Sequence, residues 1–112
     1  MEKSLNTTVE TYNEIIGYHY WKDAPEEVAF LRNNHRHRFE IRCWFPVTHD
    51  DRQIEIFLQE RAIEAYLKGQ YGDEMQLGGM SCEMLAKQLI DVFHCESVEV
   101  LEDGRGGAYV RA

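Results

Sequence analysis

The chain has 112 residues, 44% of them hydrophobic, and its acidic residues outnumber the basic ones by 20 to 12. This length suits one small domain (1–112) with a marginal core, and the hydrophobic content excludes a disordered polymer. The net charge of −8 argues against a nucleic-acid binder. The short apolar runs argue against a membrane span.

The cysteines indicate a reducing compartment. Cys43, Cys82 and Cys95 include no C-x-x-C pair and are odd in number, so they suit free thiols rather than a disulfide framework. The first residues also lack the basic and apolar leader of a secreted protein. We therefore expect a cytoplasmic protein.

Two strands and a short helix are predicted for the first half of the chain. Residues 5–21 mix β-branched and aromatic side chains, which favours a strand. Pro25, followed by two acidic residues, suits the first turn of a short helix through Leu31. From His35 the chain alternates six times, which predicts a second strand. Pro46 ends its regular part or places it at an edge.

The second half predicts a turn, a third strand, two helices and two further strands. In chain order these cover residues 49–52, 53–57, 58–68, 82–94, 97–101 and 108–110. A glycine-rich connection separates the two helices, and Ser81 is a good N-cap for the second one. The order β-β-β-α-α-β-β predicts an α+β fold, with a small antiparallel sheet and two helices packed on one face.

The histidines are the strongest functional signal. Because side chains two residues apart in a strand point to the same side, His35 and His37 face one point. His19 completes a three-histidine zinc site if it lies on the neighbouring strand, and an open fourth position is typical of catalytic zinc. A histidine pair on a half-buried strand can equally pack and bond to the backbone. His49 and His94, in a turn and at a helix end, are expected to be structural.

Four segments in the same order resemble the family of 6-pyruvoyl-tetrahydropterin synthase and 6-carboxytetrahydropterin synthase, enzymes of the tunnelling fold (T-fold). That family carries a histidine on its first strand and an H-x-H pair opening the second. The matching residues here are His19, His35 and His37. A later helix of the family opens with Thr/Ser-Ser-Glu-x-Leu-Ala, and residues 81–86 read Ser-Cys-Glu-Met-Leu-Ala. The ending, a strand with a glutamate, a turn and a tyrosine, matches Glu102 and Tyr109.

The resemblance implies a zinc-dependent carbon–oxygen lyase. Its substrate would be pterin-type, such as dihydroneopterin triphosphate, in pterin or 7-deazaguanine (queuosine-type) biosynthesis. Zinc on the three histidines would polarise a substrate carbonyl or hydroxyl and ease removal of an adjacent proton. Glu102 would accept two parallel hydrogen bonds from a 2-amino-4-oxo-pyrimidine edge, and Ser81 and Glu83 would complete the substrate-binding residues.

The chain also departs from the family pattern. The family's general base is a cysteine four residues before the H-x-H pair, and that position is Leu31 here. Glu26 and Glu27 lie too far upstream to replace it, so the catalytic base is unknown. The alternative function is a non-catalytic protein that binds or sequesters a purine- or pterin-like nucleotide. A third is a metal-free structural oligomer in which the histidines only pack.

Assembly is also predicted. A small sheet with two helices on one face leaves open strand edges, which invite pairing with another subunit. The resemblance implies an oligomeric barrel, a trimer or hexamer, with ligand sites at the interfaces. Arg36, Arg38 and Arg42 would line the face opposite the helices, either as a tunnel wall or as an ordinary solvated strand face.

Overall fold

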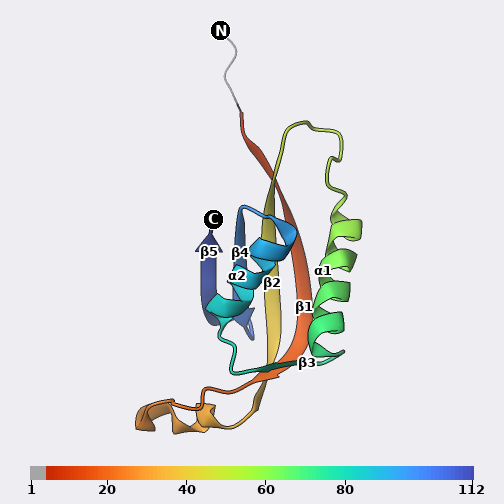
Figure 1. Cartoon of the computed structure of the whole chain (residues 1–112). Coiled ribbons are helices and arrows are strands. Elements are labelled where there is room, and N and C mark those ends of the chain that lie inside the picture. The colour runs from red at the N-terminus through yellow and green to blue at the C-terminus, as the bar shows by residue number, and fades with distance from the viewer. Residues whose placement is uncertain (1–4) are drawn as a thin grey trace.

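The computed structural model describes residues 5–112 and shows a five-stranded sheet in the order β3-β1-β2-β4-β5 (Figure 1). The elements in chain order are β1 (Thr7–His19), the 3-10 helix η1 (Glu26–Arg32), β2 (His35–Val47), α1 (Ile56–Tyr71), β3 (Met75–Gly78), α2 (Cys82–Phe93), β4 (Ser97–Glu102) and β5 (Gly106–Arg111). The predicted α+β class is confirmed. Across residues 5–112, no helix is long and apolar enough to cross a membrane.

The antiparallel pair β1–β2 is the longest feature of the sheet. It pairs from Thr7 with Val47 to His19 with His35. The alternation predicted for β2 is confirmed, since four residues of one face are buried and their neighbours lie on the other. The buried residues are Phe39, Ile41, Cys43 and Phe45. This strict pleat lets one strand serve two faces of the molecule.

Pro46 sits within β2 without disrupting the sheet. The Trp44 carbonyl faces β4, where it accepts from the Glu96 N–H, and Pro46 lies two residues further on the same side. The β2–β4 pairing has ended by then, at Trp44 and Ser97. The proline therefore lies at a local edge, where its missing N–H breaks no ladder bond.

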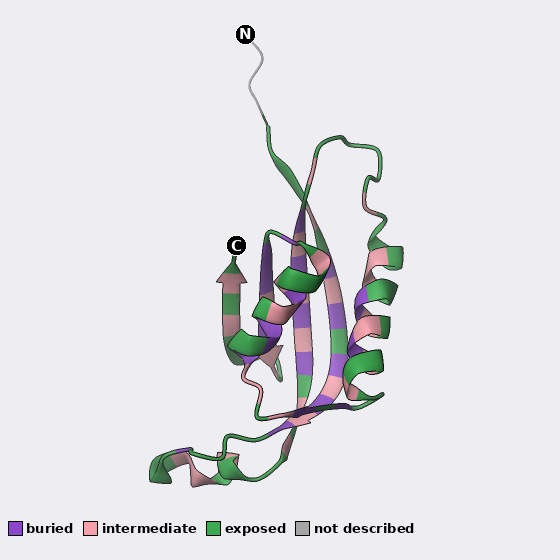
Figure 2. Cartoon of the chain, viewed as in Figure 1, coloured by how far each residue is buried: buried purple, intermediate pink, exposed green. Residues whose placement is uncertain are grey.

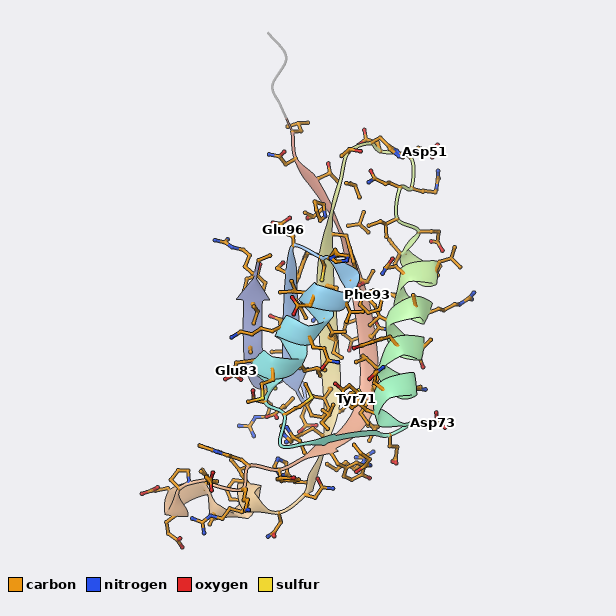
Figure 3. All side chains as sticks on the ribbon, in the orientation of Figure 1. Asp51, Tyr71, Asp73, Glu83, Phe93 and Glu96 are labelled. Atoms are coloured by element: carbon orange, nitrogen blue, oxygen red, sulfur yellow. The ribbon has the colours of Figure 1, made fainter. Side chains whose placement is uncertain are left out.

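Both α-helices pack on one face of the sheet and form a single core with it (Figure 2). Ile63 and Leu67 come from α1, and Leu85 and Leu89 come from α2; all four are fully buried. The two helices are also joined by polar contacts, because Tyr71, labelled at the end of α1 in Figure 3, donates to Gln88 of α2. The predicted placement of two helices on one face is confirmed.

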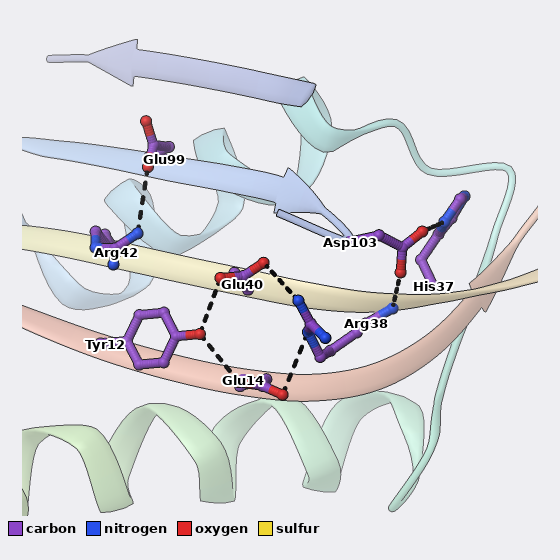
Figure 4. Close-up of polar contacts among 8 residues, drawn as sticks. All are labelled: Tyr12, Glu14, His37, Arg38, Glu40, Arg42, Glu99 and Asp103. Carbon is purple, nitrogen blue, oxygen red and sulfur yellow. Dashed lines mark hydrogen bonds and ion pairs between the residues drawn. The ribbon is translucent and has the colours of Figure 1, made fainter. Parts of the chain in front are cut away.

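The opposite sheet face carries paired charges. Arg38 contacts Glu14 and Glu40, and Arg42 contacts Glu99 (Figure 4). Arg42 also contacts Glu10. Two aromatic rings, those of Trp44 and Tyr109, also meet edge to face there. The predicted position of the β2 arginines, opposite the helices, is confirmed.

Two predictions about the sheet were wrong. Residues 53–57 form bends and the start of α1 rather than a third strand. The reason is a cap, since the Glu55 side chain accepts from the amides of Phe57 and Leu58 and so begins a helix. The sheet is also mixed and not antiparallel, because Met75–Gly78, in the glycine-rich connection, form β3 and pair parallel to the end of β1.

Candidate metal centre

Three histidines converge where β1 ends and β2 begins. His19 is the last residue of β1 and lies directly across from His35, the first of β2. His37 follows on the same face. The ring centroids are 4.7–5.2 Å apart, and one ring nitrogen of each histidine lies within 4.8 Å of the other two. The structure therefore brings together the three predicted ligands, and together they could hold a metal ion.

The same ring nitrogen, Nδ1, has an oxygen partner in each of the three histidines. Every Nδ1 faces an oxygen acceptor at 2.7–2.8 Å. The pairs are His19 with the Met80 carbonyl, His35 with the Asn33 carbonyl and His37 with the Asp103 carboxylate. An acceptor at Nδ1 holds the proton there and turns the Nε2 lone pair toward a metal. This is the outer-shell pattern of metal-binding histidines.

One of these nitrogens is buried without a partner. The closest oxygen of Glu102 is 3.6 Å from the His37 Nε2, which is too long for a hydrogen bond. Among residues 5–112 this nitrogen has no hydrogen-bond partner. An unpaired buried polar atom costs free energy, and a bound cation would remove that cost. The residues present therefore fit a metal ion.

His19 and Glu102 form a close ion pair, with 2.8 Å between Nε2 and Oε2. Burial lowers the pKa of His19, but its hydrogen bonds to Glu102 and to the Met80 carbonyl outweigh this and raise the pKa overall. The bond from His19, opposed by burial, lowers the pKa of Glu102. In the absence of metal, these two bonds favour the protonated ring, which donates from both nitrogens. A cation would take the place of the Nε2 proton.

Asp103 positions His37 from a tight turn. Asp103 and Gly104 both have positive φ, 56° and 69°, and the Arg105 N–H donates to the Glu102 carbonyl, as in a type I′ hairpin turn. The Asp103 carboxylate reaches back to β2, where it accepts from the Arg38 N–H and the His37 ring (Figure 4). These two bonds, the backbone one first, lower the pKa of Asp103.

A cavity of about 400 Å³ opens beside the histidines. His19 and His35 line one side of it, together with apolar side chains that include Trp21. All three predicted substrate-binding residues line it as well. They are Ser81, Glu83 and Glu102. The Ser81 hydroxyl already accepts from the Met84 N–H as the N-cap of α2, so its demonstrated contact is structural. A cavity of this size with a few convergent polar groups is typical of a ligand site.

The residues near the expected catalytic base offer little proton chemistry. Leu31 lines the cavity, while Glu26 lies on the exposed side of η1 and pairs with Arg32. Cys82 also lines the cavity. Burial first, and then the nearby Glu102 carboxylate, raise the pKa of this thiol to about 12. It therefore stays protonated at neutral pH and donates rather than accepts.

The other two histidines, expected to be structural, are not members of this cluster. His49 accepts the Asp51 N–H in the loop before α1, and His94 ends α2 in a left-handed conformation. Sequence reasoning missed Asp103 and the Met80 carbonyl as orienting groups. The Asp-Gly pair at 103–104 was a usable signal for a hairpin turn, whereas a backbone carbonyl leaves no signal in the sequence.

Comparison with known proteins finds no family that matches this chain and no matching curated protein. The ligand of the site is therefore inferred from the residues around it. The family resemblance described above remains a prediction.

Proposed function

We propose that the protein is a zinc-dependent enzyme of the 6-pyruvoyl-/6-carboxytetrahydropterin synthase type, with the tunnelling fold, acting on a pterin-type substrate such as dihydroneopterin triphosphate. One observation carries the proposal: a ring nitrogen from each of three histidines lies within 4.8 Å of the other two, and two of these histidines, His19 and His35, line a cavity that Glu102 also lines. Three imidazoles with an open fourth position suit catalytic zinc.

Different residues of the chain would bind different parts of the ligand. When bound, zinc would supply a Lewis acid that polarises a carbonyl or hydroxyl of the ligand. Glu102, with its lowered pKa, is a carboxylate at neutral pH and can accept two N–H groups from one edge of a pterin ring. The side chains of Trp21, Leu31 and Met80 line the same cavity and would pack against the ring and exclude water.

A second candidate uses the same cavity without catalysis. Leu31 occupies the position at which the family has the cysteine that acts as general base, and the leucine side chain can accept no proton. This favours a protein that binds or sequesters a pterin- or purine-like nucleotide. The two candidates share the metal and the pocket and differ in turnover alone.

The proposal includes an oligomeric barrel, a trimer or a hexamer, in the cytoplasm. Within the described residues, β5 pairs along one side only, with β4, so its outer edge is available to another subunit. The three cysteines are free and buried, which suits a reducing compartment. A base from a neighbouring subunit would then complete the site.

Turnover decides between the candidates. Purified protein with added zinc is incubated with dihydroneopterin triphosphate, and the products are separated by chromatography and identified by mass. Loss of the triphosphate with a new pterin product supports the enzyme, and binding without a product supports the second candidate. Zinc-loaded protein that neither binds nor converts this compound contradicts the pterin assignment.

A gain-of-function variant sharpens this test. Leu31→Cys returns a thiol to the expected base position, and we expect it to raise turnover by about 10²-fold, the lower range for general acid–base catalysis. Phe30→Cys is the matched control, because Phe30 is the neighbouring residue and is 69% exposed. Equal rates in the two variants would contradict the role assigned to position 31.

A further inference from the structure

A three-histidine site leaves a fourth position open, and Glu102 lies next to it. We propose that Glu102 is the fourth protein ligand of the metal when no other ligand is bound, so that the resting site is three histidines and one glutamate. This rests on the metal half of the proposed function and is independent of its pterin half.

The distances support direct coordination. A single carboxylate oxygen, Oε2 of Glu102, is 2.8 Å from the His19 Nε2 and 3.6 Å from the His37 Nε2. Two ligands of a tetrahedral ion with bonds of about 2.1 Å lie about 3.4 Å apart. The observed separations bracket this value. A metal on these two nitrogens therefore has the carboxylate oxygen within reach after small side-chain adjustments.

Strand pairing fixes Glu102 on the histidine side. It pairs with Phe39 of β2 and with Gly106 of β5, so its backbone is held on both sides. Val98 and Val100 lie four and two residues before it in β4 and are fully buried in the core on the helix-covered face, so Glu102 points to that face as well. His37 precedes Phe39 by two residues and shares that face.

Glu102 also lacks a permanent cationic partner. The carboxylates of the open sheet face, such as Glu14 and Glu99, pair with arginines. In residues 5–112, the ion pairs of Glu102 are made with His19 and His37 alone. Its side chain is only 30% exposed, and a partly buried carboxylate is stabilised by a paired charge. A divalent cation on neutral histidines would supply that charge.

Coordination by Glu102 has a consequence for ligand entry. Four protein ligands close a tetrahedral site, so a substrate reaches the metal only after Glu102 leaves. A ligand whose N–H groups bind the carboxylate would draw it away and open the fourth position. Binding of a ligand in the cavity would therefore change the coordination of the metal through Glu102.

Metal titration tests the ligand set without any assay of activity. Chelator-stripped protein is titrated with Zn²⁺, and with Co²⁺ to record the visible bands that depend on the ligands. We expect Glu102→Gln to lower the affinity at least about tenfold, the minimum cost of losing even an outer-shell partner, and to change the Co²⁺ bands. Glu102→Asp keeps the charge but shortens the reach, so we expect it to weaken binding as well.

The control is Glu99→Gln, the same substitution on the same strand. Glu99 faces the open side and contacts Arg42, so we expect wild-type affinity and spectrum. Wild-type binding by both Glu102 variants, with unchanged Co²⁺ bands, would overturn the proposal. In that case loss of binding in His35→Ala would still support the three-histidine site. Failed turnover with weakened Co²⁺ binding in the Glu102 variants would contradict the lyase and support the ligand set.

Discussion

Alternate residues of β2 build two polar clusters with opposite properties. On the open face, Arg38 contacts the carboxylates of Glu14 and Glu40. On the helix-covered face, His35 and His37 join His19, and the buried His37 Nε2 has no hydrogen-bond partner among the residues that the structure describes. The charged groups of the first cluster are paired with one another, whereas the second cluster, within the described residues, contains a buried nitrogen without a hydrogen-bond partner.

The difference indicates which cluster is the candidate ligand site. Burial and hydrogen bonds to Glu40 and Glu14 raise the pKa of Tyr12 to about 12, so its hydroxyl stays a donor and the open-face network stays complete. Such exposed pairs contribute about 1 kcal/mol or less each. The histidine cluster is half-buried and incomplete, and a buried polar group needs a partner. The missing hydrogen-bond partner, and not the number of charges, therefore distinguishes the candidate site.

The largest expected effect comes from comparing alanine substitutions at two adjacent β2 residues that point to opposite faces. His37→Ala removes a proposed ligand, and we expect Zn²⁺ affinity to fall by more than about 100-fold, the upper cost of losing an outer-shell partner. Arg38→Ala, the adjacent residue on the other face, should bind Zn²⁺ like the wild type, because its side chain contacts Glu14 and Glu40. Calorimetric titration of chelator-stripped protein measures both. Similar losses in the two variants would mean that the clusters are not separate.

A smaller effect on Zn²⁺ affinity is expected at Asp103, which contacts one residue of each cluster. Asp103 accepts from the His37 ring and from the Arg38 N–H. Asp103→Asn keeps an oxygen for the amide but removes the charge that orients the ring, so we expect about a 10–100-fold loss of Zn²⁺ affinity. Thermal denaturation of the metal-free variant controls for loss of the turn. Unchanged affinity would show that the bond to His37 is only structural.

The smallest expected effect is a pH dependence of stability in metal-free protein. The interactions that raise the pKa of His19 stabilise the fold fully below the unfolded pKa of 6.5. This stabilisation is lost as pH rises through the raised pKa of the folded state. The lowered pKa of Glu102 contributes above its unfolded value of 4.5, and this is lost as pH falls through the lowered pKa. The pair therefore stabilises the fold most between pH 4.5 and 6.5, by about 1 kcal/mol.

Urea unfolding in the presence of a chelator, repeated across this pH range, measures that contribution. Glu102→Gln removes the partner of His19 and should flatten the profile on both sides. Glu99→Gln should keep the wild-type shape, because Glu99 contacts Arg42 and not a histidine. An identical profile for wild type and Glu102→Gln would contradict the ion pair.

The parts of the fold that were predictable depend on local patterns. The alternation of β2 and the Ser81 cap of α2 are both readable within a few residues, and both are confirmed. The start of α1 was mispredicted because residues 53–57 alternate like a strand, whereas the Glu55 side chain caps a helix there. The strand β3 was missed because its four residues form a strand only beside the end of β1.

The sequence by itself determined that His35 and His37 share one face, because the side-chain period of a strand is two residues. It could not place His19 across from His35, or bring Glu102 and Asp103 beside His37. Those positions depend on strand order and register, which are set by packing between residues distant in the chain. Only the tertiary structure decided that two histidines on a strand become part of a three-histidine cluster with a carboxylate against it.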